Sequence, residues 1–64
     1  MIEKLSHLLE HWVEHSAEHR KKYLEWADKI ETENKEVAEI IREAAKKFEE
    51  GEKLLEKARR ELQS

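Results

Sequence analysis

Apolar residues recur every three or four positions along two long stretches of the chain, and no proline interrupts either stretch. In residues 2–31 the series is Ile2, Leu5, Leu9, Trp12, Ser16, His19, Tyr23, Trp26 and Ile30. In residues 35–63 it is Val37, Ile41, Ala44, Phe48, Gly51, Leu55, Ala58 and Leu62. This spacing follows the turn of an α-helix, so the sequence predicts an all-α chain with two amphipathic helices.

A short turn is expected between the two helices, at residues 32–34. Thr32, Glu33 and Asn34 suit a helix interior poorly, and Asn34 is a good N-cap for a helix that starts at Lys35. Two helices of about 30 residues joined by so few residues must double back on each other. We therefore expect residues 1–64 to form one antiparallel two-helix hairpin.

The second helix repeats small residues at a seven-residue interval. With the turn near Glu33, three contacts are expected: Ala44 with Tyr23, Gly51 with Ser16, and Ala58 with Leu9. Glycine in a helix interior costs about 1 kcal/mol relative to alanine, so Gly51 indicates a close approach of the helices or room for an aromatic side chain. The alternative, that Gly51 marks a kink or a neutral change, stays open.

A chain of 64 residues buries only about 60% of the surface that its unfolded form exposes, so its core is thin. Val13, Leu24, Ile40 and Leu54 flank the two apolar series and widen them. Further helices could bury this additional surface. We therefore expect the hairpin to form a homodimer, as a four-helix bundle.

The charge pattern excludes several classes of partner. Charged residues make up 45% of the chain, the net charge is -3, and the basic clusters Arg20–Lys22, Lys46–Lys47 and Arg59–Arg60 each have glutamates nearby. We interpret these clusters as solvated helix faces, not as a nucleic-acid-binding stripe. No apolar run suits a membrane span or a secretory signal, so a cytoplasmic location is expected.

Four histidines, His7, His11, His15 and His19, stand at four-residue intervals in the first helix. Residues four apart on a helix rotate by about 40° and rise by about 6 Å, so neighbouring imidazoles can reach one ion. The chain has no cysteine, and any metal must therefore be held by nitrogen and oxygen. His7 and His19 are about 18 Å apart, so pairs are the chemical unit.

The same rotation gives the histidines different surroundings. His19 is expected within the apolar series and His15 at its border, whereas His7 and His11 are expected to face solvent. Ser16 and His19 would form a polar layer that needs hydrogen-bond partners or a metal. In a two-fold dimer, His15 and His19 of both chains could supply four nitrogens to zinc, nickel, cobalt or copper, with Glu52 as a further or supporting ligand.

Two other interpretations compete with a transition-metal site. The row of four histidines, which we call the ladder, can be a structural or protein-interaction feature in which histidines and glutamates form intrahelical pairs. Alternatively, it can make the bundle sensitive to pH. Three overlapping copies of His-x-x-Glu-His, with Glu10, Glu14 and Glu18, match an inverted zinc-protease motif. The repetition and the short chain argue against an enzyme, because no third ligand or substrate cleft is evident.

The run from His11 to His19, followed by Tyr23 and Trp26-Ala27, resembles a small uncharacterised helical domain of archaea and anaerobic bacteria. That domain has the pattern His-Trp-x-Glu-His-Asn-x-Glu-His, and it sometimes follows a small nickel-binding β-domain related to carbon monoxide dehydrogenase accessory proteins. The resemblance implies handling of nickel or another transition metal by His11, His15 and His19. Ser16 replaces the asparagine of the pattern, and the β-domain is absent from this sequence.

Overall fold

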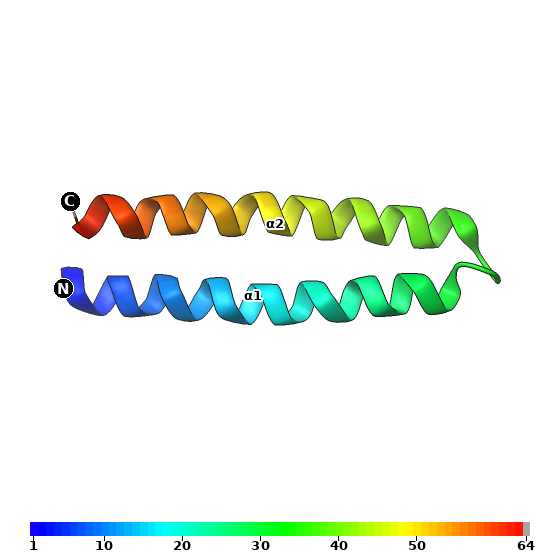
Figure 1. Ribbon diagram of the computed structural model, residues 1–64, viewed down its shortest axis with the longest axis horizontal. Helices are drawn as coiled ribbons and strands as arrows, with labels where there is room; N and C mark the ends of the chain where they lie inside the picture. The colour runs from blue at the N-terminus through cyan, green and yellow to red at the C-terminus, as the bar shows by residue number, and fades with distance from the viewer. Residues whose placement is uncertain (64) are drawn as a thin grey trace.

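The computed structural model describes residues 1–63 as two long helices packed side by side. Helix α1 spans Ile2–Ile30 and helix α2 spans Lys35–Gln63. The helices run antiparallel, and the start of α1 lies beside the end of α2 at the end opposite the turn (Figure 1). The expected all-α hairpin is confirmed. The molecule measures 48 × 14 × 11 Å, so each helix extends along nearly its whole length.

Asn34 caps the start of α2, as the sequence predicted. Its side-chain Oδ1 accepts a hydrogen bond of 3.1 Å from the backbone N–H of Val37. The N–H groups of Glu33 and Asn34 donate to the carbonyl oxygen of Ile30, at 3.0 and 2.8 Å, and these bonds close the turn at the end of α1. These three N–H groups therefore have partners within the turn itself.

The buried surface of α1 is only partly the predicted one, because the helix is rotated: Leu9 is buried and Ser16 is half-buried, as expected. Trp12, His19 and Trp26 were expected to face the second helix, but all three are exposed. The positions that follow them are turned inward instead, since Val13 and Arg20 are half-buried and Ala27 is fully buried. The prediction that placed the tryptophans and His19 in the helix interface is therefore wrong.

Helix α2 is rotated in the same sense. Ala44 and Ala58 are exposed, whereas Ala38, Ala45 and Glu52, at seven-residue intervals, are buried. Alanine at the contact lets the two backbones approach each other, and this outweighs the larger apolar area of the neighbouring columns. The expected register is also wrong, because Ser16 contacts Glu52 and Tyr23 contacts Phe48.

Gly51 does not serve a close approach between the two helices. A Cβ atom added to this residue would meet nothing within 4 Å, and Gly51 has no positive φ. The steric explanation for Gly51 is therefore wrong within the hairpin.

One side of the hairpin carries most of the large exposed apolar side chains. We call this side the apolar face, and it is defined by Leu5, Leu8, Trp12, Tyr23 and Trp26 of α1 and by Val37 and Phe48 of α2. Residues seven apart on a helix share a side, as Leu5, Trp12 and Trp26 do. The packing of Tyr23 against Phe48, with ring centroids 5.5 Å apart, joins the two halves of the face.

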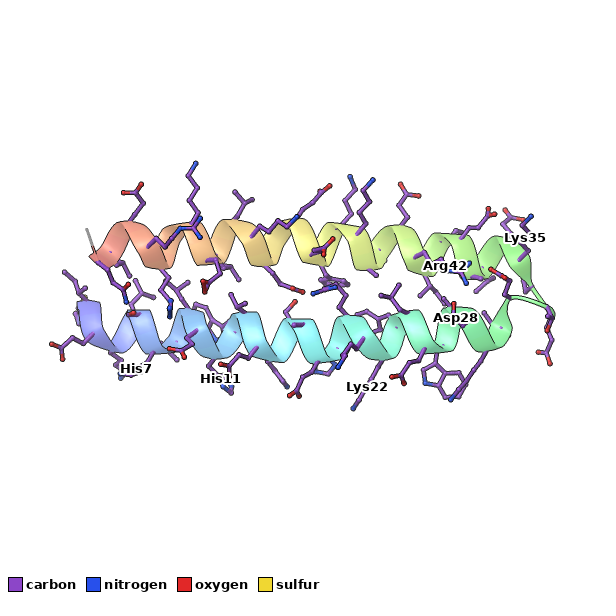
Figure 2. The ribbon with its side chains drawn as sticks, viewed as in Figure 1. His7, His11, Lys22, Asp28, Lys35 and Arg42 are labelled. Carbon is purple, nitrogen blue, oxygen red and sulfur yellow. The ribbon has the colours of Figure 1, made fainter. Side chains whose placement is uncertain are left out.

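The opposite side of the hairpin is charged and is closed by ion pairs between the helices. Arg42 of α2 binds Asp28 and Glu31 of α1, and Figure 2 shows Arg42 and Asp28 turned toward each other between the helices. Arg59 of α2 lies 3.4 Å from Glu10 of α1. Over residues 1–63, neither helix carries an apolar stretch that is long enough to cross a membrane.

Candidate functional site

His15 and His19 form a close pair on the surface of α1. They stand one helical turn apart, both side chains are exposed, and their Nε2 atoms are 3.3 Å apart. The rings meet edge to face, with centroids 4.6 Å apart and an interplanar angle of 71°. In the metal-free protein one Nε2 can donate its hydrogen to the other, so the two neutral rings then hold different tautomers.

The separation of the two Nε2 atoms suits a chelate. Zinc binds imidazole nitrogen at about 2.0–2.1 Å, and two such ligands at a tetrahedral angle lie about 3.3 Å apart. The distance between His15 Nε2 and His19 Nε2 has this value. An ion could therefore bridge the pair without a change of the helix backbone, provided that both Nε2 atoms are unprotonated.

The other two histidines are less favourably placed. The His11 ring stacks on His15 with centroids 5.7 Å apart and an interplanar angle of 20°, so these rings lie face to face. His7 and His11 project from the side of α1 that is turned away from α2 (Figure 2). Both are exposed, as expected. The ladder is therefore not uniform along its length, and its inner pair has the geometry of a chelate.

A hollow of about 230 Å³ adjoins the histidine pair on the apolar face. Its walls are formed by Trp12, His15, Ser16, His19, Tyr23 and Phe48. The His19 ring lies 6.3 Å from the ring of Tyr23, which in turn packs on Phe48. The pair is thus bordered by aromatic side chains from both helices, which shield one flank of it from water.

The polar layer in the middle of the helix interface has other members than predicted. Ser16 belongs to it, but Arg20 and Glu52 take the place that was expected for His19. Ser16 Oγ donates to Glu52 Oε2 at 2.8 Å, while Arg20 Nε and Nη2 donate to the Glu52 carboxylate at 3.0–3.2 Å. The layer is therefore satisfied by its own side chains.

The charges of this layer stabilise each other. The hydrogen bonds from Arg20 lower the pKa of Glu52 below its ordinary value of 4.5; burial opposes this shift, and the bond from Ser16 adds to it. The bond to Glu52 likewise raises the pKa of Arg20. The side chain of Glu52 is only 7% exposed, so its charge depends on these partners.

Arg20 is the residue that the sequence interpretation missed. It was grouped with Lys21 and Lys22 as part of a solvated face, and those two lysines are indeed exposed. Arg20 differs because it stands four residues after Ser16 on the same side of α1 and reaches the carboxylate of Glu52. Only the pairing of two oppositely charged residues across the hairpin could have revealed it.

Glu52, which the sequence suggested as a metal ligand, lies in this inner layer. Its two carboxylate oxygens accept hydrogen bonds from Arg20 and Ser16. Within the part of the chain that the structure describes, no group of three or more histidine, aspartate or glutamate side chains is arranged to hold a metal ion. The hairpin thus offers a pair of nitrogen donors at His15 and His19.

Comparison with known proteins places the chain in an uncharacterised family. A family model for a domain of unknown function, DUF8180, matches residues 5–62. A protein of Archaeoglobus fulgidus, described only as an uncharacterized protein, is 53% identical over 57 residues, which cover 89% of this chain and 92% of the relative. No solved structure matches the chain. The chain therefore belongs to the DUF8180 family.

Proposed function

We propose that this chain, as a member of the DUF8180 domain family, binds a transition-metal ion through His15 and His19 of α1. The observation that carries the proposal is the distance of 3.3 Å between the two Nε2 atoms, which suits two ligands of one tetrahedral ion. Both side chains are exposed, so an ion can enter from solvent. Zinc, nickel, cobalt and copper are the candidate ions, since all of them accept imidazole ligands.

The surroundings of the pair support this function over a purely structural role. Arg20, Ser16 and Glu52 satisfy one another, so the polar layer of the interface needs neither His15 nor His19. The hairpin contacts at this level would form without the pair. Residues 11–19 resemble a motif that sometimes follows a nickel-binding domain in the sequence. This resemblance supports nickel as one of the candidate ions.

The outer histidines are assigned a weaker role. His11 stacks face to face on His15, and this orientation does not direct both ring nitrogens at one ion. We propose that His7 and His11 bind metal only at high concentration. The site is proposed for binding, and no catalytic step is assigned to it.

Calorimetric titration of zinc, nickel and copper into chelator-treated protein tests the proposal. We expect a Kd tighter than about 100 μM for at least one ion, as two fixed nitrogen ligands provide. His15→Ala and His19→Ala should each weaken that binding by about tenfold or more. His7→Ala is the matched control, because it removes an exposed histidine of the same ladder, and it should change Kd by less than about twofold.

Two results would contradict the proposal. Binding weaker than about 100 μM for all three ions excludes a physiological site of this kind. Binding that survives both inner substitutions places the site elsewhere on the chain.

A second candidate function is self-association, and the apolar face favours it. Trp26 and Phe48 on this face are 63% and 47% exposed, which is costly for a chain that stays alone in water. We propose a homodimer in which two hairpins form a four-helix bundle. In this function the histidines would be surface residues beside an interface.

A further inference from the structure

We infer that a second copy of this chain covers the apolar face, and that the two copies hold one metal ion between their His15–His19 pairs. The inference rests on the proposed function of the pair and adds the source of the remaining ligands. In this dimer α1 of one copy lies antiparallel along α1 of the other. Three features of the hairpin carry it: the area of the face, the position of the pair and the number of its donors.

The uncovered area falls in the range that one partner of a stable dimer buries. The seven side chains that define the apolar face are between 36% and 63% exposed. Large side chains present about 200 Å² each, so this face leaves roughly 600 Å² of apolar side chain uncovered. Standard protein interfaces bury about 600–1,000 Å² on each partner. A second hairpin laid on this face would therefore form an interface at the lower end of the ordinary size.

Only one side of the hairpin has this character. On the opposite side Arg42 and Arg59 bind carboxylates of the other helix. Such an arrangement suits a closed assembly of two hairpins, in which the apolar faces meet and the charged sides stay in water. It does not suit an open stack that continues on both sides.

The histidine pair lies at the middle of the molecule. Ser16, which stands between His15 and His19, is the central residue of α1. The molecule is 48 Å long. If a two-fold axis crosses the helices at their middle, the apolar faces of the two copies overlap over their full length. Residues near the axis then meet their own copies, which is the property of a two-fold interface. The pair of one chain is thereby brought to the pair of the other.

The number of donors completes the argument. Each hairpin contributes two nitrogens, and residues 1–63 hold no arrangement of three or more acidic or histidine side chains for a metal. Zinc and cobalt in tetrahedral sites take four ligands. Two pairs related by a two-fold axis supply four imidazole nitrogens, so the second copy completes the site that one hairpin leaves half-built.

Sedimentation velocity and calorimetry with zinc test the inference on the full chain. We expect one zinc ion per two chains and a shift of the sedimenting species to the mass of a dimer when zinc is added. Trp26→Arg places a charge on the apolar face away from the histidines, and it should weaken both dimerisation and zinc binding by about tenfold or more. Leu24→Arg is the matched control, because Leu24 lies beside Arg42, Lys46 and Glu49 on the charged side, and it should leave both unchanged.

The outcomes separate the inference from the proposed function. One zinc ion per chain with a Kd tighter than about 100 μM overturns the shared site and leaves binding by the pair intact. A chain that stays monomeric up to about 100 μM with and without zinc overturns the second copy and assigns the face to another partner. Absence of zinc, nickel and copper binding overturns both. Circular dichroism of each variant establishes that the helices remain folded.

Discussion

The guanidinium group of Arg20 binds the carboxylate of Glu52 through two nitrogens, Nε and Nη2, at 3.0–3.2 Å. These residues are the centre of the helix interface, and they hold α1 and α2 in one register. A planar guanidinium and a carboxylate joined in this way fix each other's orientation more firmly than a lysine would. The Arg20–Glu52 pair therefore stabilises the packing of α1 on α2 beside His15 and His19.

Glu52→Gln is expected to lower the free energy of unfolding by about 2 kcal/mol, because it leaves the half-buried charge of Arg20 with only the more distant Glu49, at 3.8 Å, as counter-ion. Urea denaturation followed by circular dichroism measures this change. Glu50→Gln is the matched control. The ion pair of Glu50 with Lys47 is exposed and long, at 3.9 Å, so its loss should cost less than about 0.5 kcal/mol. Equal losses in the two variants would contradict the role of the Arg20–Glu52 pair.

The same pair predicts how stability changes with pH. The pKa of Glu52 is lower in the folded protein than its ordinary value of 4.5, chiefly because Arg20 donates hydrogen bonds to the carboxylate. The stabilisation is therefore complete above that ordinary value and is lost as the pH falls through the lower pKa of the folded state.

Urea denaturation of the wild type and of Glu52→Gln at several pH values measures this effect, because the other titrating groups are common to both proteins. The difference in unfolding free energy between them should be largest near pH 7 and should shrink below about pH 4. A difference that stays constant down to about pH 2 would show that the charge of Glu52 does not stabilise the fold.

Asn34→Ala is expected to lower the unfolding free energy by about 1 kcal/mol, because the bond from Val37 N–H to Asn34 Oδ1 is lost. Thermal unfolding followed by circular dichroism checks this value. Thr32→Ala, at an exposed position of the same turn, serves as the control and should have an effect below about 0.5 kcal/mol. If both variants lose the same stability, the cap does not direct the start of α2.

Gly51→Ala is expected to stabilise the isolated hairpin by about 1 kcal/mol, because alanine favours a helix and its Cβ meets no atom within 4 Å. Urea denaturation at low protein concentration tests the monomer. A loss of stability under these conditions would contradict the open space beside Gly51.

The sequence predicted the hairpin because spacing and turn chemistry act locally. The three- and four-residue intervals mark two helices, and Asn34 carries the capping oxygen that starts the second. The rotation of the helices was not predictable in this way. Large side chains such as Trp12 and Trp26 appeared better suited to the interface than Arg20, yet they are exposed.

The predicted rotation of the helices was wrong because residues of both helices together determine which sides pack against each other. Ala27, Ala38 and Ala45 bury little area each, but they bring the backbones close enough for dense packing. Arg20 and Glu52 enter the interface because each neutralises the other across 32 positions of sequence. Neither contribution is visible from one helix alone. The spacing of His15 and His19 did indicate a possible pair, but the distance between their Nε2 atoms came from the structure.

Nitrogen NMR of the four imidazole rings, with and without zinc, tests the central claim most directly. The claim is that His15 and His19 bind the ion through Nε2. Long-range proton–nitrogen spectra should show the Nε2 signals of these two residues moving to metal-bound values while both Nδ1 atoms keep their hydrogens. The signals of His7 should stay in place. Equal shifts along the whole ladder, or shifts confined to His7 and His11, would contradict the account.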